Sequence, residues 1–354
     1  MKNFFWLLLI FLVIFRFFST RPTYHNGDRL RLTAGIFQEP IQYSTSQYLK
    51  LSGLKIYLPL YPEISYGDQV SVEGIVDGGK LKNPKLVSIK ESRGILFKFR
   101  SKIIDFYRKV LPEPHASLVA GIVLGSKSSI PADFWQNLKT TGVAHVVVAS
   151  GMNVAFVASF LISFLAIFTP RKRAVFIAVV AIWLYALISG FEAPIVRAAI
   201  MASIAFSAQG AGKLSFSWSI LSLTALMMLI VNPSWISDTG FILTFVATGS
   251  LMLFQRRIDK LFGFIPNSLG FLREGFSTSL AAQIGVAPIL FATFGQFNLL
   301  SPLINALVLW TVPLIMIIGA VGGIVGLIVP VIGRLILLIS YPLTWCFINI
   351  VSIF

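Results

Sequence analysis

Residues 141–169 read TGVAHVVVASGMNVAFVASFLISFLAIFT and contain no Asp, Glu, Lys or Arg. A helix needs about 20 predominantly apolar residues to cross the hydrocarbon core of a bilayer. The stretch is long enough for that, and the basic cluster Arg171-Lys172-Arg173 follows it directly. It therefore predicts a transmembrane helix with a positively charged flank.

Similar apolar runs recur along the rest of the chain. They cover residues 174–191, 195–209, 214–231, 239–254, 277–294, 299–329 and 335–354. Hydrophobic residues make up 56% of the 354 residues and charged residues only 12%, whereas soluble chains carry about 25% charged residues. We therefore predict a polytopic α-helical membrane protein in which residues 141–354 form a multi-helix transmembrane domain.

The positive clusters predict how the spans are oriented. Short loops rich in Lys and Arg stay on the cytoplasmic side of a membrane. Placing Arg171–Arg173 and Arg256–Lys260 there, and alternating the spans, puts Asn232–Asp238 outside. The same alternation predicts a cytoplasmic N-terminus and places the segment that precedes the spans outside the cell membrane.

The first 21 residues form a separate segment. Phe4–Phe18 is apolar apart from Arg16 and lies between Lys2 and Arg21, which is typical of a short transmembrane signal anchor. A cleaved signal peptide is the alternative, but Thr20-Arg21-Pro22 is a poor cleavage site.

Residues 26–92 change to a two-residue alternation of apolar and polar side chains, which is the period of a half-buried strand. The expected strands are Asp28–Ile36, Gln47–Leu51, Leu54–Leu58, Gln69–Val76 and Lys85–Ile89, separated by turns at Tyr66–Asp68, Asp77–Gly79 and Asn83–Pro84. Five short strands in so few residues favour a small extracytoplasmic all-β barrel of the OB type.

Residues 95–140 link the two parts. Ile95–Leu111 places basic and apolar residues at helical spacing, which is typical of an amphipathic helix at a membrane surface. We therefore expect an interfacial helical region here. The formal net charge of the whole chain is +15, which indicates an anionic partner, either phospholipid head groups or nucleic acid.

Polar residues inside the apolar runs are the candidates for the translocation path, because each is costly in a membrane and marks a functional site by default. They are His145, Ser150, Gly151, Asn153, Glu192, Arg197, Asp238, Gln283 and Asn305. Two other interpretations stay open: Arg197 forms a structural ion pair with Glu192 or Asp238, and His145 is a packed, hydrogen-bonded histidine.

Motifs for catalysis and cofactors do not form. Gln209–Leu214 resembles a phosphate loop but has Ser207 and Leu214 where the motif needs Gly and Ser or Thr. His145 and Ser150 would lie about 140° apart on one helix, too far for a nucleophile and its base. With one Cys and three His, a zinc cluster is out of reach. We predict no catalytic residue, no metal and no cofactor.

Four segments, in order, resemble the membrane domain of the ComEC-type competence proteins, the inner-membrane DNA-uptake channels of bacteria. They are Leu118–Gly125 with Thr141–His145 and Ala149–Val154; Tyr185–Met201 with Ser189-Gly190-Phe191 and Val196-Arg197-Ala198; Asn232-Pro233 through Asp238–Phe241 to Thr244-Phe245; and Ala282-Gln283, Pro288, Phe294–Phe297, Ser301-Pro302 and Asn305. The resemblance covers about residues 95–315, and the residues before it match the OB-like domain of that family.

The resemblance implies an inner-membrane, multi-pass channel that carries single-stranded DNA into the cytoplasm during natural transformation. It also implies a cytoplasmic helicase-like ATPase and an extracytoplasmic DNA receptor as partners, and a homo-oligomer is possible. Asn153 stands where the family usually has His, and Ile242 and Thr244 replace a frequent Gln and Ser. The metallo-β-lactamase-like domain of many relatives is absent from the sequence, so we expect conduction of DNA without degradation of the opposite strand.

Basic residues of the β-rich segment are the DNA-binding candidates: Arg29, Arg31, Lys50, Lys55, Lys80 and Lys82. Interleaved with Tyr48 and Tyr57, they suit single-stranded nucleic acid, which is held by backbone charge and base stacking. A solvated surface that also attracts lipid head groups is the plain alternative. At the level of the whole protein, the alternatives are a membrane-anchored binder of nucleic acid or another anionic polymer, and a transporter of another anionic substrate.

Overall fold

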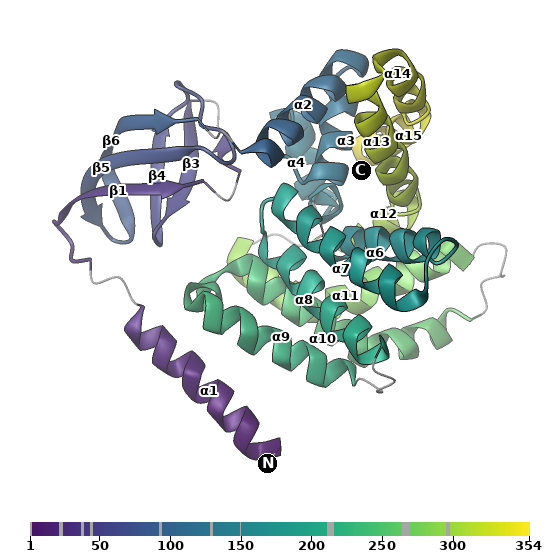
Figure 1. The fold of residues 1–354 in the computed structure, drawn as a ribbon, viewed down its shortest axis with the longest axis horizontal. Coiled ribbons are helices and arrows are strands. Elements are labelled where there is room, and N and C mark those ends of the chain that lie inside the picture. Colours follow the sequence, from purple (N-terminus) through teal and green to yellow (C-terminus); the bar gives the residue numbers. More distant parts are fainter. Residues whose placement is uncertain are drawn as a thin grey trace.

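The computed structural model describes residues 2–20, 24–36, 39–42, 45–91, 94–127, 130–148, 150–210, 216–263, 270–294 and 298–354. A small sheet lies beside a larger helical body, and the N-terminal helix α1 (Lys2–Ser19) stands apart from the sheet (Figure 1). Arg16 of α1 donates a hydrogen bond to the carbonyl of Ile230 at 3.2 Å, so α1 contacts the helical body.

Six strands form the sheet: β1 (Arg29–Gly35), β2 (Ile41–Gln42), β3 (Ser46–Leu51), β4 (Leu54–Pro59), β5 (Gln69–Asp77) and β6 (Lys80–Lys90). Their order is β1-β5-β6-β4-β3-β2. All neighbours are antiparallel except β4 and β6, which are parallel. Because side chains alternate along a strand, one face supplies the sheet's core, including Leu49, Ile56 and Val70.

The five predicted strands are present, but the turn predicted at Asn83–Pro84 is wrong. Both residues lie inside β6, which begins at Lys80. Asn83 has a φ of 51°, and the register between β5 and β6 shifts between Glu73 and Ile75. A bulge thus absorbs the turn-forming pair, because one extra residue on a bulged strand needs no partner in the ladder.

Helices make up the rest of the described chain (Figure 1). They are α2 (Ile95–Val110), α3 (His115–Leu124), α4 (Ala132–Thr140), α5 (Ala144–Val147), α6 (Gly151–Leu165), α7 (Arg171–Ile188), α8 (Ala193–Gly210), α9 (Ser217–Val231), the 3₁₀ turn η1 (Pro233–Ser237), α10 (Thr239–Leu261), α11 (Gly270–Phe294), α12 (Ser301–Val308), α13 (Thr311–Ile328), α14 (Pro330–Leu338) and α15 (Tyr341–Ile353).

Three of the predicted spans are not single helices, among them 335–354, which divides between α14 and α15. The stretch 141–169 breaks between α5 and α6, where Val148 is extended with a ψ of 139°. The stretch 299–329 divides into α12 and α13. An isolated α-helix would satisfy its own backbone at membrane depth, so each break must find partners elsewhere in the protein.

Several helices are suited to a bilayer by length and composition. Three helices among the described residues are long and apolar enough to cross one, at Thr239–Leu261, Leu272–Thr293 and Thr311–Ile328, and α5 and α6 together, over Ala144–Leu165, make a fourth candidate span. The pair α14 and α15, bent by 42°, makes a fifth if it is counted as one span. Shorter apolar helices pack beside them, among them α8 and α9.

Helix α2 places its apolar face against protein. Ile103 and Tyr107 are buried in the core shared by α2, α3 and α13, and the Tyr107 hydroxyl donates to the carbonyl of Gly319 at 2.8 Å. Its basic residues Lys98, Lys102 and Arg108 are exposed. The amphipathic pattern of α2 is therefore explained by packing on α3 and α13, and only its basic side remains open.

Candidate functional site

The outward face of β3 and β4 gathers aromatic and basic side chains. Tyr48 is paired directly with Tyr57, and Lys50 with Lys55. The centres of the two tyrosine rings are 5.2 Å apart. Lys55 is in turn paired with Lys80 of β6, so three exposed lysines lie in a row across three neighbouring strands. We call Tyr48, Tyr57, Lys50, Lys55 and Lys80 the strand face.

The other basic candidates do not join the strand face. Arg31 lies 3.6 Å from the Glu73 carboxylate, and Lys82 lies 3.9 Å from Asp77. Both pairs are largely exposed, so the carboxylates weaken the local positive potential without holding it firmly. Arg29 is exposed on β1, which pairs with β5 and not with β3 or β4.

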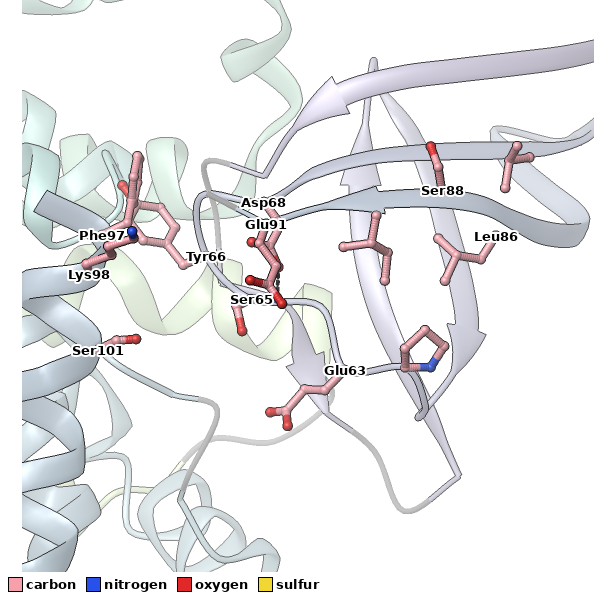
Figure 2. A pocket seen from close by; sticks show the side chains of 13 residues that line it. Glu63, Ser65, Tyr66, Asp68, Leu86, Ser88, Glu91, Phe97, Lys98 and Ser101 are labelled. Carbon is pink, nitrogen blue, oxygen red and sulfur yellow. Dashed lines mark hydrogen bonds between the residues drawn. The ribbon is translucent and has the colours of Figure 1, made fainter. Parts of the chain in front are cut away.

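A cleft of about 770 Å³ separates the sheet from α2. It lies between β6, the loop from β4 to β5, and the first turns of α2, and Glu63, Asp68 and Glu91 project along it (Figure 2). These three carboxylates disfavour a nucleic-acid backbone by charge. We call the six-stranded sheet and its loops the β-module. The cleft is therefore the acidic side of the β-module, and the strand face is its basic side.

Ionic contacts join the sheet to the helical body, and we call Glu39, Arg100, Ser126, Lys127 and Glu192 the junction cluster. Glu39 accepts from Arg100 of α2 at 3.2 Å, from the Ser126 hydroxyl at 2.9 Å and from the backbone N–H of Lys127. The Lys127 ammonium donates to Glu192, which directly precedes α8. Two ion pairs, Arg100–Glu39 and Lys127–Glu192, thus join four separate segments of the chain.

Tyr66 adds a second link at the same place. Its hydroxyl donates to the carbonyl of Leu187 at 2.6 Å, and the Arg100 guanidinium lies 4.9 Å from the centre of its ring. Burial raises the pKa of Tyr66, an effect that the positive charge of Arg100 partly opposes. The phenol therefore stays protonated and remains a donor at physiological pH.

Arg197 has no carboxylate partner among the described residues, so the interpretation of a structural ion pair with Glu192 or Asp238 is wrong. Glu192 is engaged by Lys127. Asp238 caps α10, because its carboxylate accepts from the N–H of Phe241 at 2.9 Å. Arg197 itself donates to the carbonyl of Thr244 at 3.0 Å.

The start of α6 lies against Arg197. A methyl group on Gly151 would come within 2.6 Å of the guanidinium, so glycine here leaves room for the arginine head. Ser150 donates to the Asn153 amide oxygen at 3.4 Å, and the Asn153 amide nitrogen donates to the carbonyl of Ile122 at 2.9 Å. Four sequence candidates, Ser150, Gly151, Asn153 and Arg197, therefore meet here.

His145, Gln283 and Asn305 belong to a different group around α12. His145 and Ser301 both contact the Gly142 carbonyl, at 3.0 and 3.4 Å. Asn305 donates to Ser279 at 2.8 Å and to Ser301 at 3.3 Å. Gln283 donates to the carbonyl of Asn298 at 3.3 Å. These contacts support the interpretation of His145 as a hydrogen-bonded histidine. Ser150 bonds to Asn153 and not to His145.

Sequence reasoning missed the residues of the junction cluster other than Glu192. Glu39 and Lys127 lie in loops, and Arg100 is one of several basic residues on an amphipathic helix. Arg100 differs from the others because it is buried, with 5% of its surface exposed. Its position on the apolar side of α2, one turn before Ile103 and Ile104, is the only local signal of that role.

The fold and these sites define a protein with an apolar, helix-rich body and a small basic β-module. The competence protein family matches residues 122–354, and the chain belongs to this family, of the ComEC type. It is similar to ComE operon protein 3 of Bacillus subtilis (strain 168), with 28% identity over 231 residues. The alignment covers 64% of this chain but only 28% of the relative. No solved structure matches the chain.

Proposed function

We propose that the protein is an inner-membrane channel that carries single-stranded DNA into the cytoplasm, with the strand face as its external contact for the DNA. The family indicates a role in DNA uptake for competence. The observation that carries the finer proposal is the strand face, which sets paired tyrosines beside a row of lysines. Stacking platforms next to backbone-binding charges are the usual means of holding single strands without sequence preference.

The strand order supports an OB-type barrel. If β1 and β2 are the two halves of one bent first strand, the order β2-β3-β4-β6-β5-β1 runs around a five-stranded barrel. Its third and fifth strands, β4 and β6, are the parallel pair. In that frame β3 and β4 are the second and third strands, the face on which OB folds bind oligonucleotides. The strand face lies there.

Contacts at the junction support an external position for the β-module. Tyr66 bonds to Leu187 at the end of α7, and Lys127 pairs with Glu192 just before α8. The basic cluster Arg171–Arg173 lies at the opposite end of α7. If that cluster stays in the cytoplasm, the β-module lies outside and the N-terminus inside. The channel needs an external energy source, for which a cytoplasmic helicase-like ATPase and an extracytoplasmic DNA receptor are the proposed partners.

Binding of fluorescent oligothymidylate to the full chain in lipid nanodiscs tests the strand face. We expect Lys50→Gln/Lys55→Gln/Lys80→Gln to weaken binding and to flatten its salt dependence, because each phosphate contact contributes a slope of about −0.7. The matched control, Arg31→Gln/Lys82→Gln, removes charges that already face carboxylates and should change binding less. Equal losses in the two variants would contradict the assignment of the strand face.

Passage of DNA needs its own experiment. Cells with and without the gene are compared for internalised, labelled DNA, and surface-bound DNA is removed by nuclease. Loss of uptake with surface binding retained supports the channel. Normal uptake without the gene would contradict it. A merely membrane-anchored binding protein would instead retain function when Gly151, Asn153 and Arg197 are replaced together.

A further inference from the structure

The start of α6, the end of α7 and the start of α8 lie close together. Helices α6, α7 and α8 pack on one another through Val154, Ile182 and Ile195. Because they alternate in direction, the start of α6, the end of α7 and the start of α8 lie at one end of this unit. The corner from α7 to α8 is tight, with Phe191 in the left-handed region at a φ of 48°, a conformation that side chains other than glycine rarely adopt.

Three polar groups at this end have unmet hydrogen-bonding capacity. The Tyr185 hydroxyl, the Ser189 hydroxyl and the Arg197 Nε are buried without a partner, and they are half of the six such side-chain atoms among the described residues. Ser189 is only 3% exposed. Buried polar groups in native proteins are nearly always bonded, so three unpartnered groups at one end of these helices make it a candidate binding site.

The residues that carry these unpartnered atoms lie close to the start of α6. Tyr185 and Ser189 are one helical turn apart, and the Tyr185 hydroxyl lies beside the side chains of Ser189 and Asn153. Asn153 is in the first turn of α6, and Gly151 at its start touches the Arg197 guanidinium. The hydroxyls therefore adjoin the first turn of α6 at Asn153, and the guanidinium adjoins the start of the same helix at Gly151.

The chemistry of this group is that of an anion site. The two hydroxyls and the Arg197 Nε each carry a hydrogen that can be donated. Arg197 also brings a positive charge with no ion pair among the described residues. The side chain of Ser150, which stands at the N-cap of α6, makes no capping bond to the helix. A helix N-terminus with free N–H groups attracts negative charge and binds phosphate. An acceptor with several anionic oxygens would satisfy these groups together.

We propose that Tyr185, Ser189, Arg197 and the N-terminus of α6 bind a phosphodiester of single-stranded DNA. This inference rests on the proposed function for the identity of the ligand. The site lies at the end of α7 that carries Leu187, the residue bonded to Tyr66 of the β-module. The β-module therefore contacts the same end of these helices.

The test uses the full chain in nanodiscs of phosphatidylcholine, so that no anionic lipid competes. Inorganic phosphate is the first probe, and the readout is the rise in unfolding temperature relative to chloride at equal ionic strength, because a ligand of the folded state stabilises it. We expect a rise in the wild type, a smaller one in Tyr185→Phe, Ser189→Ala and Arg197→Lys, and none in Arg197→Gln. Thr224→Val is the control, since it removes a buried, unpartnered hydroxyl elsewhere, on α9; it should respond as the wild type does.

A second readout separates binding from a structural role. Without phosphate, Tyr185→Phe and Ser189→Ala should unfold at the same temperature as the wild type or higher, because each removes a buried donor that lacks a partner. A lower unfolding temperature together with an unchanged phosphate effect would mean that these hydroxyls serve packing, and would overturn the proposal.

Two further arms identify the ligand. Oligothymidylate should stabilise the wild type more than Arg197→Gln, while both still bind it through the strand face. If the wild type binds the oligonucleotide but neither probe distinguishes Arg197→Gln, the anion site fails and the proposed function stands. If the wild type does not bind it at all, the proposed function fails. If only phosphatidylglycerol in the nanodisc stabilises the wild type over Arg197→Gln, the site holds a lipid head group and the DNA assignment is wrong.

Discussion

Replacing Glu39 by Gln should loosen the attachment of the β-module to the helical body. The carboxylate is the common acceptor for Arg100, Ser126 and the Lys127 backbone. Glu39→Gln keeps one oxygen acceptor but removes the negative charge, so the Arg100 guanidinium is left as a buried charge without a counterion. The glutamine also places its N–H₂ group against at least one donor, because both carboxylate oxygens already accept hydrogen bonds.

The size of the effect follows from burial. The Arg100 and Glu39 side chains are only 6% and 9% exposed, and breaking a buried ion pair by removing one partner costs about 3–5 kcal/mol. The exposed pair Arg31–Glu73 is the matched control, with side chains that are 59% and 48% exposed. Such surface pairs contribute about 0–1 kcal/mol, so Glu73→Gln should have little effect.

Denaturant unfolding of the purified full chain in detergent, followed through the accessibility of the junction to protease, measures both variants. We expect Glu39→Gln to lower the free energy of opening by about 3 kcal/mol, and Glu73→Gln by well under 1 kcal/mol. The double variant Glu39→Met/Arg100→Met should recover part of the loss, because replacing both members of a buried pair by apolar residues is often neutral. Equal effects of Glu39→Gln and Glu73→Gln would refute the reasoning.

Three other results are expected. Tyr57→Ala and Tyr48→Ala should each weaken oligothymidylate binding by about 1–3 kcal/mol if each ring stacks on a base, measured by anisotropy at fixed salt; unchanged affinity in both would remove stacking from the proposal. In a chain whose own cysteine has been replaced, Asp77→Cys should react with an impermeant thiol reagent from outside and Lys172→Cys should not, and the reverse pattern would invert the topology. Because the pKa of Tyr66 is raised from 10.0 on folding, the unfolded chain loses that proton first, and stability falls as pH rises above about 10; Tyr66→Phe should show a shallower fall in a pH series of thermal unfolding, and an identical slope would argue against the buried phenol.

Local patterns in the sequence predict the elements well and their contacts poorly. The two-residue alternation predicts β3 and β4 because one face of each strand is buried, and it also sets Tyr48 and Lys50 on the opposite face. The turn at Asn83–Pro84 was wrong because a bulge in a long strand uses the same residue types as a turn.

The pairing of charged residues also could not be predicted from the sequence. The cost of a charge in an apolar segment singled out Arg197 and Glu192 from the sequence, and their nearness along the chain suggested that they pair. In the structure the partner of Glu192 is Lys127, from a loop some 65 residues away. Which carboxylate meets which cation depends on tertiary packing, and the spacing of residues along one helix carries no information about a third segment.

The polar groups near α12 and at the start of α6 differ in how the chain satisfies their hydrogen bonds. Near α12 the carbonyl of Gly142 is contacted by His145 and Ser301. The single unpartnered buried side-chain atom there is the amide oxygen of Asn305, whose amide nitrogen donates to Ser279 and Ser301. At α6 the unpartnered buried atoms are two hydroxyls and the Arg197 Nε, and the nearest amide, Asn153, donates to the carbonyl of Ile122. The polar group near α12 is therefore largely satisfied within the chain, whereas the group at the start of α6 is the one to which the anion proposal assigns an acceptor from outside.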